Sequence, residues 1–249
     1  MRRIRTIALL VVAVASGAAR ADFKVKLPDA EFGEFEIETV GNYGRSGNPA
    51  LNNEQSFVHE FEYGVSNFWR TGLEFETGRD PGPGKRFKFD RTTWENWFVL
   101  GERGQYWLDA ALFAEYSKAL YRYNPDEIKL GPILRKEIGP TINTVNLFFS
   151  KNIGDFSGIN RLNFEYAWET RIATGGIIEP GIQAYSEPGA IGHFASLSGQ
   201  DHRVGPQLFG VLHQLGPGSL KFNAGVLFGL TPAAPRQTFR WQAEYAVHF

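Results

Sequence analysis

The sequence predicts an all-β protein, a transmembrane antiparallel up-and-down β-barrel of about 12 strands. Three observations lead to this fold class. Apolar and polar residues alternate in one segment after another, as they do on the two faces of a half-buried strand. The links between these segments alternate between short and long. Charged residues gather on one of the two phases, where they would be costly if that face touched lipid.

The expected strands cover most of the chain beyond residue 33. Segment 238–249 shows the alternation best, because Phe239, Trp241 and Tyr245 share one phase while Arg240 and Glu244 share the other. An aromatic content of 14%, 28 glycines and the lack of any segment with helical period favour a single β domain. The twelve expected strands are 34–43, 55–65, 69–77, 87–100, 106–117, 127–138, 143–151, 161–172, 178–187, 203–212, 220–230 and 238–249.

The links between these strands provide an independent test of the fold. Single-chain membrane barrels have short turns at the periplasmic end and longer loops at the outer end. The expected short links are 66–68, 101–104, 139–142, 173–177 and 214–219. The expected long or intermediate links are 44–54, 78–86, 118–126, 152–158, 188–202 and 231–236. With both chain ends in the periplasm, every longer link falls outside, and a soluble sandwich would not require this order.

Two features fit the pattern less well. In segment 87–100, Trp94, Trp97 and Phe98 do not share a face, so the lipid-facing phase of that strand stays open. Prolines stand inside the expected sixth, ninth and tenth strands, at positions 132, 180 and 206. Because a proline removes a ladder donor, each is expected at a rim, at a bulge or at the start of a strand. The sequence leaves these three placements open.

The first 21 residues have the pattern of a secretory signal peptide. A basic stretch with Arg2, Arg3 and Arg5 precedes a short apolar run, and Ala19 and Ala21 form a small-x-small cleavage pattern. The apolar run is far shorter than the roughly 20 residues that a spanning helix needs. We therefore expect a signal peptide at 1–21 and a barrel domain at 22–249.

The charge balance and the absence of cysteine exclude several classes of protein. Removal of residues 1–21 leaves 22 basic against 27 acidic residues, a net charge of −5. Nucleic-acid-binding domains carry a basic excess on one face, so we expect no nucleic-acid partner. Without any cysteine, the chain neither forms disulfides nor binds metal through thiolates. No cofactor and no metal site are expected.

The end of the chain resembles the C-terminal signature strand of Gram-negative outer-membrane β-barrels. Tyr245, Val247 and Phe249 stand where that signature has its apolar residues and its terminal phenylalanine. The resemblance covers about a dozen residues. It implies recognition by the barrel-assembly machinery and insertion into outer-membrane lipid. These three residues are the expected assembly signature.

A narrower resemblance is to the Gram-negative porin-like barrels that include outer-membrane proteins linked to phenol meta-pathway degradation. It rests on strand count, on size and on Gly-Pro pairs within strands, at Gly131-Pro132 and Gly205-Pro206. This resemblance implies the passage of small solutes, aromatic ones among them.

If the apolar phases face lipid, the charged phases line the lumen. Of the expected lumen-lining residues, the first three strands supply six carboxylates and one arginine, whereas most basic residues come later. The expected lumen-lining residues are Glu36, Glu38, Glu60, Glu62, Arg70, Glu74, Glu76, Arg135, Arg161, Glu165, Arg240 and Glu244.

This lining has two interpretations. The charges form either a network of ion pairs that fills a narrow barrel or an aqueous channel whose acidic wall favours cations. Twelve strands lie between eight, which side chains can fill, and the sixteen to eighteen of open porins. Both interpretations stay open at this point.

Catalysis is the weaker hypothesis. Some outer-membrane barrels hydrolyse lipid with a Ser-His pair, and the longest link holds His193, Ser196, Ser198 and His202. The residues around His193 match no lipase or deacylase motif. We therefore predict no enzyme and no catalytic residue, but a channel or transporter for small solutes in the outer membrane of a Gram-negative bacterium. The alternatives are a barrel enzyme of phospholipase or lipid A deacylase type and a structural barrel without an open pore.

Overall fold

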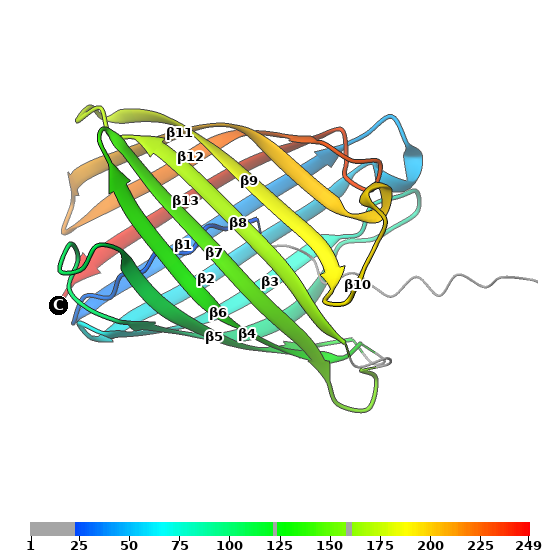
Figure 1. The fold of residues 1–249 in the computed structure, drawn as a ribbon, viewed down its shortest axis with the longest axis horizontal. Coiled ribbons are helices and arrows are strands. Elements are labelled where there is room, and N and C mark those ends of the chain that lie inside the picture. Colours follow the sequence, from blue (N-terminus) through cyan, green and yellow to red (C-terminus); the bar gives the residue numbers. More distant parts are fainter. Residues whose placement is uncertain (1–22, 122–123, 158–160) are drawn as a thin grey trace, which may run out of the picture.

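The computed structural model describes residues 23–121, 124–157 and 161–249, so the expected signal peptide lies outside the described residues. Twelve long strands form one closed antiparallel sheet, as predicted, and each strand pairs with its neighbours in the chain (Figure 1). The strands are β1 (Glu34–Arg45), β2 (Glu54–Ser66), β3 (Trp69–Arg79), β4 (Lys88–Val99), β5 (Asp109–Ala119), β6 (Asp126–Ile138), β7 (Thr141–Ile153), β8 (Leu162–Ile172), β9 (Ile178–Ala190), β11 (Asp201–Leu215), β12 (Gly218–Gly229) and β13 (Gln237–His248). A thirteenth, β10 (His193–Phe194), folds back and pairs antiparallel with Gly189 and Ala190 at the end of β9.

The ring closes where the sequence predicts, between the first and last strands. β1 and β13 pair from Glu34–His248 to Arg45–Gln237 without a register shift. Phe249 follows β13, and its amide donates a hydrogen bond to the Gly33 carbonyl at 3.2 Å. A closed sheet leaves no unpaired strand edge, which is the condition for a β-structure to cross a bilayer. Among the described residues, no helix is long and apolar enough to cross a membrane.

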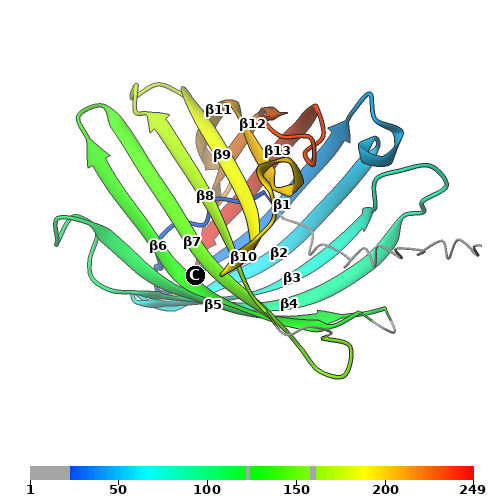
Figure 2. The ribbon, with the colours of Figure 1, turned by 45° about the vertical axis from the view of Figure 1, so that its right-hand side comes forward.

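The two ends of the barrel differ in their connections, as Figure 2 shows. We call the end where β1 begins and β13 ends the turn end; its links are 67–68, 100–108, 139–140, 173–177 and 216–217. The opposite, loop end carries links 46–53, 80–87, 120–125, 154–161, 191–200 and 230–236. Two short 3-10 helices, Pro49–Leu51 and Leu197–Gly199, lie in the loop-end links.

One predicted link is wrong in length. Tyr106 does not begin β5, which starts at Asp109, so the link at 100–108 is nine residues rather than four. The Asp109 carboxylate accepts a hydrogen bond from the Gly104 amide at 2.7 Å and fixes a turn in which Gly104 has a φ of 75°. Tyr106 and Leu108 continue the apolar alternation of β5 through this turn, which is why the pattern alone placed the strand too early.

The structure assigns the phase of β4 that the sequence left open. Trp94 and Phe98 are exposed on the outer surface, whereas Trp97 is 2% exposed and points into the lumen. Trp97 packs there edge-on against Phe113, with ring centroids 5.2 Å apart, and Phe113 packs against Phe148. The aromatic residues of this strand therefore lie on both faces.

Two of the three prolines lie in the interior of their strands. In β6 the ladder to β7 omits Gly131 and Pro132, and in β11 the ladder to β12 omits Gly205 and Pro206. A Cβ on Gly131 would lie 1.9 Å from the Leu147 carbonyl oxygen, and one on Gly205 would lie 1.8 Å from the Val226 carbonyl oxygen. At each Gly-Pro pair, the glycine lets the backbone of the next strand come close, and the proline that follows has no N–H to donate to the ladder. Pro180 is the third residue of β9.

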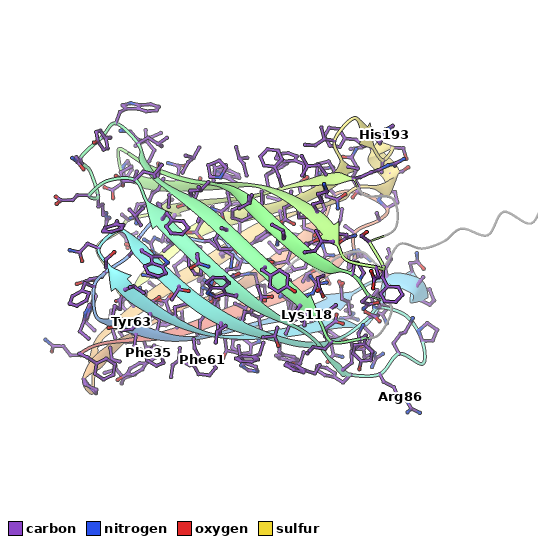
Figure 3. The ribbon with its side chains drawn as sticks, turned by 90° about the horizontal axis from the view of Figure 1, so that it is seen from below. Phe35, Phe61, Tyr63, Arg86, Lys118 and His193 are labelled. Atoms are coloured by element: carbon purple, nitrogen blue, oxygen red, sulfur yellow. The ribbon has the colours of Figure 1, made fainter. Side chains whose placement is uncertain are left out.

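The outer and inner surfaces of the barrel have opposite chemistry. Leu73, Leu130 and Ile182 are exposed outward, and Phe35, Phe61 and Tyr63 lie toward the turn end (Figure 3). Among the described residues, polar and charged side chains outnumber apolar ones in the buried set. A soluble domain would bury the reverse. The interior is therefore a polar lumen and the outer surface is the face that fits lipid.

Candidate functional site

The lumen is occupied by the chain that precedes β1. Residues 23–28, which we call the N-terminal segment, run through the barrel without joining the sheet, and Phe23, Lys24, Val25 and Lys26 are all buried (Figure 1). The sequence analysis assigned no structure to this stretch. It is the main feature of the lumen that was missed.

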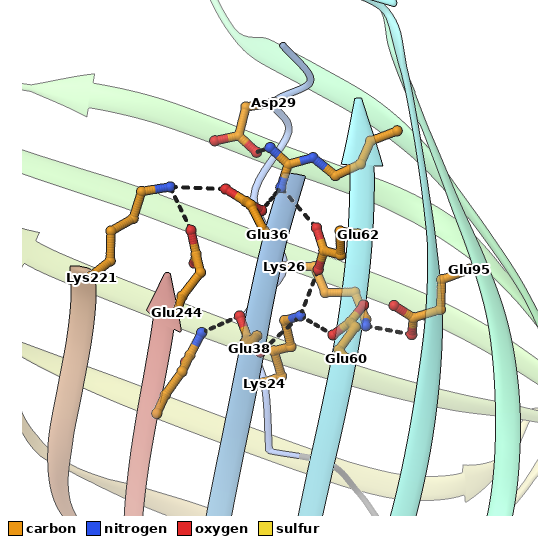
Figure 4. Close-up of polar contacts among 12 residues, drawn as sticks. Lys24, Lys26, Asp29, Glu36, Glu38, Glu60, Glu62, Glu95, Lys221 and Glu244 are labelled. Atoms are coloured by element: carbon orange, nitrogen blue, oxygen red, sulfur yellow. Dashed lines mark hydrogen bonds and ion pairs between the residues drawn. The ribbon is translucent and has the colours of Figure 1, made fainter. Parts of the chain in front are cut away.

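The side chains of two lysines anchor the N-terminal segment to the wall. Lys24 Nζ lies 2.9 Å from Glu38 Oε1 and 3.2 Å from Glu62 Oε1, and it also contacts Glu60 (Figure 4). Lys26 Nζ lies 2.6 Å from Glu95 Oε1. These carboxylates stand on β1, β2 and β4, so the two lysines tie three strands together. Ion pairs enclosed in this way are much less screened than pairs on a protein surface.

Backbone contacts fix the segment along the barrel axis. The Lys26 amide donates to Asn146 Oδ1 at 2.7 Å, and Asn146 Nδ2 donates to the Lys26 carbonyl at 2.9 Å. One side chain of β7 thus supplies the pair of hydrogen bonds that a neighbouring strand would supply. On the opposite wall, Arg240 Nε donates to the Phe23 carbonyl. The segment is therefore held from two sides.

Apolar contacts complete the fit near the start of the described chain. The Phe23 ring packs edge-on against Tyr185, with centroids 5.4 Å apart, and the Arg203 guanidinium lies 4.2 Å from the Phe23 ring centre. Val25 belongs to the same cluster as Ala167 and Leu227. These residues come from β8, β9, β11 and β12, the wall opposite the carboxylates. The segment therefore has a charged side and an apolar side, and each faces matching chemistry.

At the turn end, the chain leaves the lumen by crossing β2. The Gly33 amide donates to the Gly64 carbonyl at 2.9 Å, and Gly33 has a φ of 80°. A Cβ on Gly64 would lie 1.7 Å from the Glu31 carbonyl oxygen, so only glycine fits under the crossing chain. Asp29 lies 3.4 Å from Arg70 on β3.

The space left in the lumen is small. A cavity of about 90 Å³ lies on the turn-end side of the segment, lined by Asp29, Glu36, Arg70 and Lys221 among others. A second cavity, of about 30 Å³, lies on the loop-end side and is lined by Phe23, Glu187 and Asp201 among others. Ligand pockets usually measure about 300–1,000 Å³. With the N-terminal segment in place, neither of these two cavities reaches that size.

The carboxylates near the segment are more numerous than the lysines. Oxygen atoms of Glu60, Glu74 and Glu95 lie within 4.8 Å of one another. Two unit charges about 5 Å apart repel by roughly 3 kcal/mol at an effective dielectric constant of about 20. The ammonium group of Lys24, in contact with Glu38, Glu60 and Glu62, offsets part of this repulsion.

A second network lies toward the turn end. Arg70 Nη1 lies 2.6 Å from Glu36 and 2.9 Å from Glu62, and Lys221 Nζ lies 3.2 Å from Glu36 and 2.6 Å from Glu244. Figure 4 shows how Glu62 connects the two networks, because it contacts Lys24 with one oxygen and Arg70 with the other.

The structure places the predicted lumen residues on the inner face, with one exception. Arg161 is wrong as a lumen residue: it precedes β8 and is exposed, because the strand begins one residue later than the charge pattern suggests. Glu76 lies 3.8 Å from Arg91, Glu165 lies 2.9 Å from Lys129, and Arg135 lies 3.5 Å from Glu137. The residues on the inner face are Glu36, Glu38, Glu60, Glu62, Arg70, Glu74, Glu76, Arg135, Glu165, Arg240 and Glu244.

The sequence contained a signal for the missed segment. The six carboxylates and one arginine predicted for the lumen on the first three strands leave an imbalance that a closed lumen cannot hold without cations. Lys24 and Lys26 follow the expected cleavage site directly and stand two residues apart, so an extended chain presents them on the same side. The unmatched carboxylates and these lysines together would have predicted the contact.

The histidines and serines of the longest link do not meet as a catalytic pair there. His193 is exposed on β10 at the loop end (Figure 3), and Ser196 Oγ lies 3.0 Å from Ser198 Oγ. His202 is engaged elsewhere: its Nδ1 lies 2.6 Å from Ser186 Oγ and its Nε2 lies 2.8 Å from Gln200 Oε1.

Comparison with solved structures finds proteins of similar overall architecture. No protein-family model matches the chain, and no curated protein is similar to it in sequence. The outer membrane protein Omp33 of Acinetobacter baumannii is 13% identical, with a TM-score of 0.46 over 90% of this chain and 100% of that one. LpxR of Salmonella typhimurium is 8% identical (TM-score 0.41; 87% and 100% covered), and the anion-selective porin of Comamonas acidovorans is 12% identical (TM-score 0.38; 87% and 98% covered).

Loss of the Asn146 amide should loosen the N-terminal segment. In Asn146→Ala, the two hydrogen bonds to Lys26 disappear and a buried carbonyl and amide lose their partner, at a cost of about 1–3 kcal/mol. We expect faster amide hydrogen exchange in residues 23–28, measured by mass spectrometry, while exchange in β1 and β2 is unchanged. Thr144→Val on the same inner face of β7 is the matched control. Equal exchange in the two variants would show that Asn146 does not hold the segment.

Proposed function

We propose that this protein is an outer-membrane channel or transporter for small solutes, with an acid-rich lumen that the N-terminal segment closes. The observation that carries the proposal is the seating of residues 23–28 in a polar bore by Lys24 and Lys26. A barrel with only a structural role has no need of a charged lumen, since apolar side chains fill small barrels. Here most of the bore is polar, and a short extended segment occupies its middle.

The way the segment is held favours its displacement. Lys24 and Lys26 contact four carboxylates through ion pairs, and the backbone adds hydrogen bonds to Asn146 and Arg240. Water and dissolved ions can replace such polar contacts, and the apolar surface that displacement exposes is confined to the small cluster of Phe23 and Val25. The strands are held by their own ladders, including the β1–β13 closure, so the segment can move while the barrel stays closed. Solute passage would then follow displacement of residues 23–28.

The carboxylate wall sets the expected selectivity. Once Lys24 and Lys26 leave, Glu38, Glu60, Glu62 and Glu95 face the open bore together with Glu74. A ring of acidic side chains favours cations in a channel. The preference for small aromatic solutes, implied by the resemblance to meta-pathway barrels, is a separate proposal that the lumen chemistry does not address.

Planar-bilayer recording tests the channel directly. We expect the full chain to give small or infrequent conductance steps and Lys24→Gln/Lys26→Gln to give larger and more frequent ones, because the segment loses its charged anchors. The currents should prefer cations. Replacement of Glu60, Glu62, Glu74 and Glu76 by Gln should reduce that preference.

Two outcomes would contradict this account separately. If no variant gives conductance steps, the protein is not a channel. If steps occur but the reversal potential in a salt gradient is unchanged by the four Gln substitutions, the carboxylates do not set the selectivity.

One hydrogen-bond chain supports a second candidate, a barrel enzyme acting on lipid. Ser186, His202 and Gln200 are linked in series, which is the order of a nucleophile, a base and an orienting group. Ser186 is only 3% exposed, and glutamine cannot offset a positive imidazolium as a carboxylate does. The channel is therefore the better supported function.

Lipid turnover distinguishes these two candidates. We expect purified protein in mixed micelles to release no fatty acid from phospholipid or lipid A, and His202→Ala to behave like the unaltered chain. Release of fatty acid that is lost in both His202→Ala and Ser186→Ala, but kept in His193→Ala, would establish the enzyme instead.

A further inference from the structure

The surroundings of the two lysine ammonium groups form a built site. Carboxylates approach them from three strands, with Glu38 on β1, Glu60 and Glu62 on β2, and Glu95 on β4. All four carboxylates are at most 4% exposed. The wall residues lie in unbroken stretches of the β1–β2 and β3–β4 ladders, which hold their backbones in place independently of the N-terminal segment.

Aromatic faces complete this site. Lys26 Nζ lies 4.8 Å from the centre of the Phe113 ring and 5.3 Å from the centre of the Trp97 ring, and Lys24 Nζ lies 6.0 Å from the Trp97 ring. Cations attract aromatic faces within about 6 Å, and proteins use this contact to recognise organic ammonium groups. A hard metal ion instead requires several oxygen ligands around it and gains little from a ring. The combination of rings and carboxylates therefore fits an organic cation.

The carboxylates offer more acceptors than the two lysines use. Glu60 Oε1 and Glu95 Oε2 are buried and have no hydrogen-bond partner among the described residues. Both side chains are also part of the cluster in which oxygens of Glu60, Glu74 and Glu95 lie within 4.8 Å of one another. Buried carboxylate oxygens without a donor are costly. A ligand with more than one ammonium group would supply the missing donors.

We propose that this site, formed by Glu38, Glu60, Glu62, Glu95, Trp97 and Phe113, binds small organic cations that carry primary ammonium groups, and that Lys24 and Lys26 occupy it as internal competitors. The inference rests on the proposed channel function and names its class of solute. Lys24 and Lys26 bring two ammonium groups to this site from one short stretch of chain. A linear diamine likewise carries two ammonium groups on one short flexible chain.

Competition gives the site a direct consequence for transport. A solute that takes the place of Lys24 and Lys26 removes the ion pairs that hold the N-terminal segment in the bore. The same event that binds the solute therefore opens its path. Uncharged solutes of equal size would not open it, because they cannot replace the ammonium groups among buried carboxylates.

Calorimetric titration of the purified barrel in detergent tests the site with 1,4-diaminobutane as the probe. We expect Lys24→Gln/Lys26→Gln to bind the diamine at least ten-fold more tightly than the full chain, because the internal competitors are gone. Addition of Glu60→Gln and Glu95→Gln should abolish that binding. Addition of Glu169→Gln, which removes a carboxylate from the opposite wall, should leave it unchanged. Potassium and calcium chloride are titrated in parallel.

A second measurement uses the unaltered chain, in case the lysine variant does not fold. Increasing diamine should raise amide hydrogen exchange in residues 23–28, because the bound diamine displaces the segment. An equal concentration of 1,4-butanediol should not raise it.

Several outcomes would overturn the inference. Equal diamine affinity with and without the lysines, no effect of diamine on exchange, or tighter binding of calcium than of diamine would each exclude an ammonium site with internal competitors. The experiments distinguish a wrong channel proposal from a wrong binding-site proposal. Potassium conductance without diamine binding leaves the channel and rejects the site, whereas diamine binding without conductance in any variant leaves the site and rejects the channel.

Discussion

The structure depends on the neutralisation of buried carboxylates inside a closed sheet. β1, β2, β3 and β4 direct Glu38, Glu60, Glu62, Glu74 and Glu95 into one region of the lumen, where little space is left for water. An isolated buried charge costs several kcal/mol, and neighbouring carboxylates add their repulsion. Lys24 and Lys26 reduce this cost, and so the chain before the first strand becomes part of the interior. The seating of that segment, the small remaining cavities and the proposed selectivity all follow from this constraint.

The closed sheet and the charged interior support each other. A bilayer excludes unpaired backbone groups, so the strands must form a ring in which β13 pairs with β1. The period of two in each strand then sends every second side chain inward. Because lipid does not tolerate charge, the charged phase has only the lumen to occupy. A sequence that keeps charge away from lipid in this way gathers its charged side chains in a narrow lumen. The lysines of the N-terminal segment offset part of the negative charge there.

Local patterns predicted the barrel well and the segment poorly. Strand number, closure and the inner phase follow from short-range alternation, which a membrane barrel keeps over each strand. One error lies where the same alternation has another cause, because Tyr106 and Leu108 continue it through a turn. The phase of β4, which the alternation left open, is decided by the packing of Trp97 against Phe113 inside the lumen.

The contacts of Lys24 and Lys26 join residues up to 120 positions apart, as in the hydrogen bonds between Lys26 and Asn146. No local pattern contains such a pairing, although the unmatched carboxylates of the first three strands indicate that cations must come from elsewhere. The Ser186–His202 contact was also out of reach, because it depends on the register between β9 and β11.

The central claim, that residues 23–28 lie within the lumen, is tested most directly by cross-linking in intact outer membranes. The chain has no cysteine, so a single pair can be introduced at Val25 and Ala167, which belong to one buried cluster. A short thiol-reactive linker should join the two positions and shift the mobility of the unfolded chain. A pair at Ala111 and Ile133, which face each other on β5 and β6, is the positive control. Linkage of the control pair without any linkage between positions 25 and 167 would contradict the account.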